Sequence, residues 1–124
     1  MRSAQVNRKT KETDIQLSFS PDGGDVSVST GIGFFDHMLT AFAVHGGFGL
    51  VLAVKGDLDV DTHHTVEDTG IALGTAIKQS LGDMSGINRY GSFYIPMDEA
   101  LAHCALDISN RPFLVFNADF AEEK

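Results

Sequence analysis

The sequence predicts an α/β fold, a two-layer α+β sandwich in which helices cover a β-sheet. Three observations indicate this fold class. Residues 14–20 alternate polar and apolar side chains, which is the period-two pattern of a half-buried strand. Residues 34–45 change to helical spacing, with Phe35 and Leu39 four positions apart. Residues 61–81 give a second, longer helical pattern, so strands and helices interleave along the chain.

The strands are predicted in this order. The strand over 14–20 is followed by a Pro-Asp-Gly-Gly turn at 21–24, and alternation resumes over 25–29, which predicts a β-hairpin. Residues 48–54 form an apolar strand. Residues 56–61 predict a turn that leads into a short strand.

Two helices are predicted between these strands. The helix over 34–45 stops at two consecutive glycines. The second helix is capped by Asp61 or Thr62 and runs to about Leu81, where a Gly-Asp pair ends it. Helical spacing predicts a buried stripe on this second helix, formed by Val66, Ala72, Leu73, Ala76, Ile77 and Leu81.

The last third of the chain returns to strand patterns, over residues 92–95, 100–109 and 113–120. The stretch 99–109 faintly resembles 12–20, since each begins with glutamate and continues as an alternating strand. This echo predicts two half-domains, one over 1–88 and a second, incomplete one over 89–124.

Composition limits the class of protein. A chain of 124 residues with 43% hydrophobic and 21% charged residues suits one globular domain. A net charge of −8 argues against nonspecific binding to nucleic acid or to anionic membranes, although a local phosphate pocket stays possible. The chain has no apolar run of about 18 residues and no signal core. Its single cysteine, Cys104, excludes an internal disulfide, so we expect a cytoplasmic protein.

Residues 61–68 carry the strongest chemical signal, with two imidazoles and three carboxylates in eight positions. On a helix, His63 and Glu67 stand at i and i+4 on one face, close enough to bind one ion. His64 points about 100° away, so the pattern predicts two metal positions, each needing ligands from elsewhere. The alternative, a solvated helix start beside capping carboxylates, is less favoured. Imidazole with carboxylate suits Mn²⁺, Fe²⁺, Co²⁺ or Zn²⁺, with preference for the harder ions.

The other two histidines near helix ends are less specific. Asp36 precedes His37 and either orients an imidazole or satisfies amides at the helix start; the sequence leaves both open. His45 by itself fits a helix C-terminus, where a cation is favourable. His103 alternates with Cys104 in a strand and is expected to be structural.

Several charged residues are candidates for substrate contacts. Arg89 and Arg111 stand in turn-like contexts of an acidic chain, and either phosphate binding or surface ion pairing fits each of them equally well. Glu12 is a possible acid–base group, although solvation at a strand end is the better reading of that residue alone. The Gly-x-Gly before the first helix lacks the third glycine of a dinucleotide site, so nucleotide binding is not predicted.

Taken together, these motifs resemble the imidazoleglycerol-phosphate dehydratase family in order and over nearly the whole chain. The matching stretches are residues 8–13, 31–39, 45–46, 61–68, 86–91, 96–101 and 110–112. The resemblance implies duplicated half-domains, each packing a four-stranded sheet against two helices, and homo-oligomers of 24 subunits. It also implies Mn²⁺, two ions per subunit in the complete enzyme.

The resemblance further implies an activity and a set of site residues. The reaction is the dehydration of D-erythro-imidazoleglycerol phosphate to imidazole acetol phosphate, a hydro-lyase step of histidine biosynthesis. Implied metal ligands are His37, His63, His64 and Glu67, and the implied acid–base groups are Glu12 and Glu67. Implied substrate contacts are Glu12, His37, His45, His63, Glu67, Arg89 and Arg111, with the arginines holding the phosphate.

The sequence departs from the family pattern in one respect. A second lone histidine and a second His-His-x-x-Glu, expected in the second half, do not occur in the 124 residues. We therefore expect a truncated dehydratase that is inactive by itself. The alternatives are a non-catalytic metal-binding module, regulatory or for storage, and an assembly domain whose histidines make only contacts between chains. The paired arginines favour a phosphorylated substrate over both.

Overall fold

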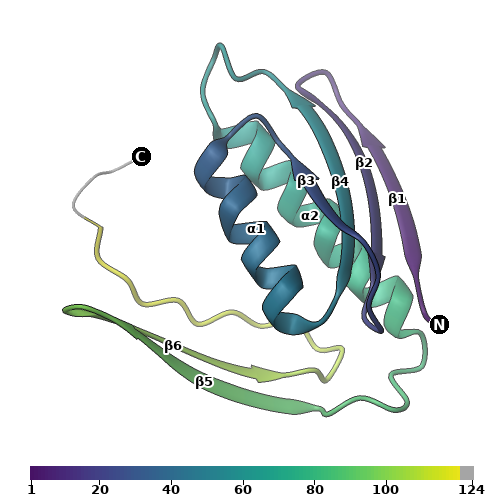
Figure 1. Cartoon of the computed structure of the whole chain (residues 1–124), viewed down its shortest axis with the longest axis vertical. Helices are drawn as coiled ribbons and strands as arrows, with labels where there is room; N and C mark the ends of the chain where they lie inside the picture. The colour runs from purple at the N-terminus through teal and green to yellow at the C-terminus, as the bar shows by residue number, and fades with distance from the viewer. Residues whose placement is uncertain (121–124) are drawn as a thin grey trace. The chain divides into compact units, whose positions relative to one another are not determined.

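The structure, a computed structural model, describes residues 1–120. The chain forms two compact units, Met1–Ser85 and Gly86–Lys124. The first unit contains four strands and two helices, and the second contains one pair of strands (Figure 1). This division lies close to the predicted boundary after residue 88, while the repetition of one half-domain by the other stays a prediction.

A four-stranded sheet forms one layer of the first unit. In spatial order its strands are β1 (Ala4–Lys9), β2 (Thr13–Ser20), β4 (Gly49–Gly56) and β3 (Val26–Ser29). β1, β2 and β4 pair antiparallel, whereas β3 pairs parallel to β4. Parallel neighbours need a crossover, and helix α1 (Gly33–Gly46) provides it.

The predicted hairpin between residues 14–20 and 25–29 is wrong. β2 instead pairs with β1, a strand that the sequence analysis missed, and its other edge pairs with β4. The inward side chains of β4 include Leu50 and Leu52, which are almost fully buried, whereas β3 is short and its valines are only half-buried. The central place in the sheet therefore goes to the strand that buries more apolar area.

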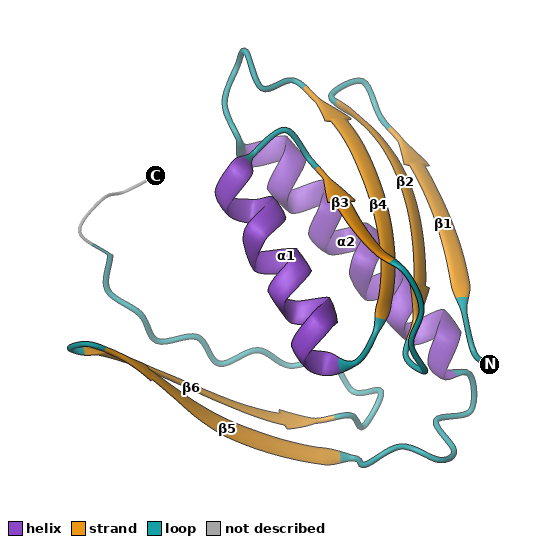
Figure 2. Cartoon of the chain, in the orientation of Figure 1, coloured by secondary structure: helices purple, strands orange, loops and turns teal. Residues whose placement is uncertain are grey.

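Two helices lie on one face of this sheet, as Figure 2 shows, which confirms the predicted fold class. Helix α2 (His63–Leu81) packs against β2, β1 and β4, and α1 packs against β3 and β4. Both helices occupy almost the predicted ranges. Gly47 ends α1 in the left-handed conformation, with φ of 71°, which few residues other than glycine adopt without strain.

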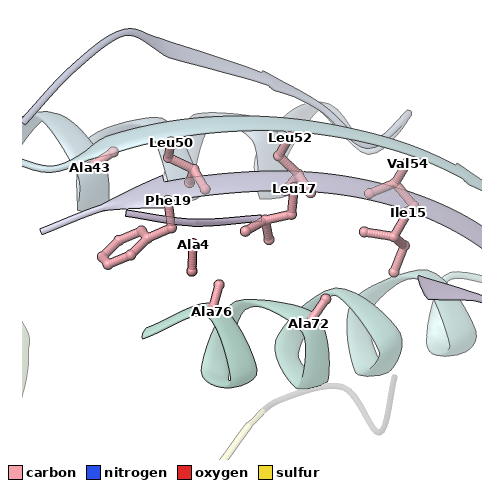
Figure 3. Packing of buried hydrophobic residues seen from close by; sticks show 10 residues of the cluster. All are labelled: Ala4, Ile15, Leu17, Phe19, Ala43, Leu50, Leu52, Val54, Ala72 and Ala76. Carbon is pink, nitrogen blue, oxygen red and sulfur yellow. The ribbon is translucent and has the colours of Figure 1, made fainter. Parts of the chain in front are cut away.

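The core lies between the sheet and the helices (Figure 3). Its buried members are apolar side chains from three strands and both helices: Ala4, Ile15, Leu17, Phe19, Ala43, Leu50, Leu52, Val54, Ala72 and Ala76. Small alanines on the helices allow the helices to approach the larger side chains of the strands closely.

The predicted stripe of α2 is correct toward its C-terminus and wrong at its start. Ala72, Ala76 and Leu81 are buried, and Leu73 and Ile77 pack against the core, but Val66 is 41% exposed. The first turns of α2 instead bury polar side chains, namely Thr65, Asp68 and Thr69. The short strand predicted before α2 is also absent from the structure, because residues 58–60 form a turn in which the Val60 amide donates to the Asp57 carbonyl.

The second unit contains β5 (Tyr90–Met97) and β6 (Ala100–Asp107), which form an antiparallel hairpin. Both predicted strands are therefore confirmed, within shifted bounds. The predicted strand over 113–120 is wrong, since these residues are irregular and, among the described residues, pair with no strand. Across residues 1–120, no helix is long and apolar enough to cross a membrane.

Candidate metal centre

The N-terminal turn of α2 places His63 and Glu67 in contact. His63 Nε2 lies 2.8 Å from Glu67 Oε2, at the i, i+4 spacing predicted from the sequence. The Asp61 carboxylate accepts a hydrogen bond of 2.9 Å from the His63 amide, so Asp61 satisfies one of the free amides at the helix start. Both side chains of the pair are more than half exposed, at 66% and 54%. One imidazole nitrogen and one carboxylate oxygen are thus held together at the surface.

His64 makes a different contact. Its Nδ1 lies 2.8 Å from Asp57 Oδ2, and its ring stands edge-on to the His63 ring with centroids 5.4 Å apart. Because an ionised carboxylate only accepts, Nδ1 must carry the proton in this contact. The neutral ring then keeps its lone pair on Nε2, which is the arrangement that metal-binding histidines commonly have.

Carboxylates surround His64 and change its acidity. The hydrogen bond to Asp57 raises the pKa of His64, against an opposing effect of burial. The negative charges of Asp57, Glu12 and Asp61 raise it further. Glu12 therefore acts on His64 although it comes from the turn between β1 and β2, far away in the sequence.

Helix α2 also carries a buried carboxylate near its start. Asp68 is 8% exposed and accepts a hydrogen bond of 2.6 Å from the Thr13 hydroxyl. This hydrogen bond, with the charge of Arg8, lowers the pKa of Asp68. Asp68 is therefore an ionised group in the interior, next to the helix residues predicted to bind metal.

The two histidines of α1 do not join this group as one cluster. Both are exposed, His37 in the first half of the helix and His45 in its last turn. Eight residues of α-helix separate them by about 12 Å along the axis. Asp36 accepts hydrogen bonds from the amide and hydroxyl of Thr30, so the structure shows it satisfying the backbone before the helix rather than orienting His37.

Among residues 1–120, no group of three or more histidine, cysteine, aspartate or glutamate side chains is arranged to hold a metal ion. The structure brings together His63 with Glu67, and His64 with Asp57. It does not bring His37 into either pair. That each of the two predicted metal positions takes further ligands from outside α2 stays a prediction.

The predicted phosphate-binding arginines belong to the second unit. Arg89 makes two contacts with Asp107, Nε to Oδ1 at 2.6 Å and Nη2 to Oδ2 at 3.2 Å, and its guanidinium lies 5.0 Å from the Tyr90 ring centroid. The pKa of Asp107 is lowered by the hydrogen bond from Arg89 and also by the charge of Arg111. Arg89 thus makes an exposed ion pair, and Arg111 acts on the same carboxylate through its charge, while phosphate binding by either arginine stays a prediction.

His103 has the structural role expected for it. Its ring stacks on Tyr94 with centroids 4.0 Å apart, and its Nε2 lies 2.9 Å from the Ser92 hydroxyl. All three side chains lie within the β5–β6 hairpin, in which Tyr94 is paired directly with His103.

Two aspartates of the site were missed from the sequence. Asp68 stands four residues after His64, so helical spacing could have shown that both lie on one side of α2. Asp57 lies in a turn, where no periodic pattern relates it to His64. Only the packing of that turn against the start of α2 brings the two together.

Comparisons with known proteins agree with the resemblance seen in the motifs. The model of the imidazoleglycerol-phosphate dehydratase family matches residues 30–124. An imidazoleglycerol-phosphate dehydratase from Phenylobacterium zucineum is 59% identical over 99% of this chain and 63% of that protein. Another, from Acetivibrio thermocellus, is 60% identical over 99% of this chain and 64% of that protein. The chain thus spans just under two thirds of the length of these curated relatives.

A solved structure shows the same fold. The crystal structure of imidazoleglycerol-phosphate dehydratase from Staphylococcus aureus superposes with a TM-score of 0.79 at 39% identity. The superposition covers 98% of this chain and 66% of that one. The family model, the relatives and this fold all agree, and the chain belongs to the imidazoleglycerol-phosphate dehydratase family.

Proposed function

We propose that this chain forms part of a metal-dependent hydro-lyase that converts D-erythro-imidazoleglycerol phosphate to imidazole acetol phosphate, a step of histidine biosynthesis. Family membership supports the reaction. The observation that carries the proposal is the arrangement at the start of α2, where His63 contacts Glu67 and His64 is held through Nδ1 by Asp57. A helix start that only needed solvation would not require an imidazole fixed in this way.

The donor atoms present fit the proposed metal, Mn²⁺, with two ions per complete subunit. His63 and Glu67 offer one nitrogen and one oxygen donor, and His64 offers Nε2 in another direction, which suits a hard or borderline divalent ion. We propose His37, His63, His64 and Glu67 as this chain's ligands. Because the described residues provide no complete set, other parts of the assembly must complete each coordination shell.

The residues of this chain have separate tasks in the proposed reaction. A bound metal would supply Lewis-acid activation and orient the substrate. Glu12 and Glu67 are the groups able to hold or move a proton; Glu12 acts electrostatically on His64, whereas Glu67 contacts His63. We propose that Arg89 and Arg111 bind the phosphate, since Asp107 holds the Arg89 guanidinium in one orientation and leaves its remaining N–H groups to donate.

The residues proposed to contact substrate include members of each unit. They are Glu12, His37, His45, His63, Glu67, Arg89 and Arg111. His37 and His45 lie at separate places along α1, so one copy of the helix could serve two sites in an assembly. This supports a homo-oligomer, of 24 subunits as in the family. The lone cysteine supports a reducing cytoplasmic setting.

We expect the 124-residue chain by itself to bind Mn²⁺ weakly and to form no product. Its sequence has a single His-His-x-x-Glu, and among its described residues only two predicted ligands, His63 and Glu67, form an ion-pair contact. Calorimetric titration with Mn²⁺ measures the binding. The His63→Ala variant should lose its affinity for Mn²⁺. The His103→Ala variant, which changes a histidine of the β5–β6 hairpin, should retain it.

A segment exchange tests the activity. The segment of the Phenylobacterium zucineum relative that matches this chain is replaced by these 124 residues, and formation of imidazole acetol phosphate is measured with Mn²⁺ and with a chelator. We expect Mn²⁺-dependent product from the exchanged protein and none when it carries His64→Ala.

The relative itself and the exchanged protein with His103→Ala are the controls. Should the exchanged protein fold, assemble and bind Mn²⁺ without forming product, while the relative is active, the dehydratase proposal is wrong for this chain. That result would favour the non-catalytic metal-binding assembly module.

A further inference from the structure

Asp68 joins helix α2 to the turn between β1 and β2. Its Oδ2 accepts the hydrogen bond of 2.6 Å from the Thr13 hydroxyl, and the Thr10 hydroxyl lies 3.5 Å from the same oxygen. Arg8 Nη2 lies 3.5 Å from the other oxygen. One helical side chain thus contacts the end of β1, the turn and the start of β2. We call these four residues the Asp68 cluster.

The carboxylate also fixes the direction of the hydrogen bonds within the turn. An ionised Asp68 only accepts, so the single Thr13 hydroxyl proton points to it. The Thr10 hydroxyl oxygen accepts the backbone amides of Glu12 and Thr13, each at 3.1 Å. Its own proton must then point to Thr13 or to Asp68. A charged Asp68 therefore fixes the direction of the Thr13 hydroxyl and limits the Thr10 proton to two acceptors within the cluster.

The cluster joins the turn that contains Glu12 to the helix that contains His64. Glu12, a proposed acid–base group, lies in the turn between the two threonines. Asp68 stands at i+4 from His64, so both lie on the same side of α2. Burial keeps the Thr13–Asp68 pair of the cluster away from competing water, since Thr13 is 3% and Asp68 8% exposed, whereas Arg8 and Thr10 are partly exposed. The hydrogen bonds inside it are correspondingly costly to break.

We propose that Asp68 is a positioning residue that holds Glu12 in a fixed place relative to His64. It touches neither metal nor substrate and acts only through the turn. The inference rests on the proposed function, because the place of Glu12 matters only at a working site. The positioning itself can be measured without metal or substrate, so it can fail independently of the dehydratase proposal.

Amide hydrogen exchange in the 124-residue chain provides the first test. We expect Asp68→Asn to speed exchange at the Glu12 and Thr13 amides about tenfold, because a neutral amide oxygen accepts weaker hydrogen bonds than an ionised carboxylate, while β4 amides stay protected. The control is Ser80→Ala, which removes another buried polar group of α2, a hydroxyl that donates to the Ile77 carbonyl. Unchanged exchange at Glu12 and Thr13, or equal acceleration throughout the unit, would overturn the proposal.

A second pair of variants keeps the test decisive if Asp68→Asn does not fold. Thr13→Val removes the hydroxyl that donates to Asp68 at similar volume, whereas Thr13→Ser retains it. We expect only the valine variant to loosen the turn. Equal behaviour of the two variants would contradict the proposed role of the hydroxyl–carboxylate contact.

The coupling between Glu12 and His64 tests positioning directly. At one fixed pH, Glu12→Gln should shift the His64 ring-proton resonances because it removes a nearby negative charge. This shift should vanish in the Asp68→Asn background and persist in the Ser80→Ala background. If it persists with Asp68→Asn, then Glu12 keeps its place without Asp68 and the proposal fails. An inactive exchanged protein, by contrast, would leave this result unaffected.

Discussion

The close approach of α2 to the end of β4 gives a sharp prediction for Gly56→Ala. A Cβ added at Gly56 would lie 1.9 Å from Thr65 Oγ1 and 3.2 Å from Thr65 Cβ. The first separation is roughly 1.5 Å shorter than an ordinary contact. Thr65 is fully buried and β-branched, so it can rotate away only with difficulty.

The expected size of the effect follows from two opposing terms. Overpacking of this kind costs about 1–3 kcal/mol. The new methyl group also restricts the unfolded chain, and this effect stabilises the folded state by about 0.4–1 kcal/mol. Because the separation of 1.9 Å is a severe overlap, the overpacking cost should lie in the upper half of its range. We therefore expect Gly56→Ala to lower the free energy of unfolding by about 1–2.6 kcal/mol, and Tm by roughly 4–20 °C for a unit of this size.

Urea unfolding of four chains measures this effect: the original, Gly56→Ala, Thr65→Ala and the double variant. Thr65 Oγ1 is buried without a hydrogen-bond partner among the described residues, so Thr65→Ala should cost less than about 1 kcal/mol. The double variant should recover most of the stability lost by Gly56→Ala, because the atom closest to the new methyl is gone.

Gly74→Ala is the matched control. A Cβ at this exposed helical position meets nothing within 4 Å, so helix propensity should stabilise the variant by about 0.5–1 kcal/mol. If Gly56→Ala proved as stable as the original chain and showed no coupling to Thr65, the packing of α2 against β4 described above would be refuted.

Two further predictions concern pH. The pKa of His64 is raised, chiefly by the hydrogen bond to Asp57, so the stability from this pair is fully present below the ordinary value of 6.5 and is lost as pH rises through the folded pKa. The difference in urea midpoint between the original chain and Asp57→Asn should therefore shrink from pH 6 to pH 9; a difference that grows would contradict this. The hydrogen bonds from Arg2 lower the pKa of Asp22 to about 2 from 3.8, so its contribution is present above pH 3.8 and is lost as pH falls through about 2. An NMR titration should give that midpoint for Asp22, and Arg2→Ala should move it toward 3.8; a midpoint unaffected by Arg2→Ala would exclude this ion pair as the cause.

Local sequence patterns were sufficient for the helices and for part of the site. The 3.6-residue period and the glycine stops located both helices, because these signals depend on neighbours only a few residues away. The contact between His63 and Glu67 was predictable for the same reason. The exposure of Val66 was not, since the face that a helix buries at its start depends on the strand it meets.

Pairing of the strands required information that no local pattern contains. Residues 14–20 and 25–29 have the alternation and the turn of a hairpin, yet β4 lies between them. The central position in the sheet is the most buried one, and β4 occupies it because Leu50 and Leu52 bury more apolar area than the valines of β3. Likewise, the strand predicted over 113–120 has no partner in the described part of the chain, and alternation alone does not form a strand.

Patterns in the sequence were enough to infer the α/β class, the extents of the two helices, the adjacency of His63 and Glu67, and the family. These follow from spacing along the chain, which fixes geometry within a helix. The fold was needed to establish the strand order, the pairing of His64 with Asp57 and the burial of Asp68 against Thr13. Those contacts join residues that are distant in sequence, and the packing of helices on the sheet, rather than any local preference, selects which of them form.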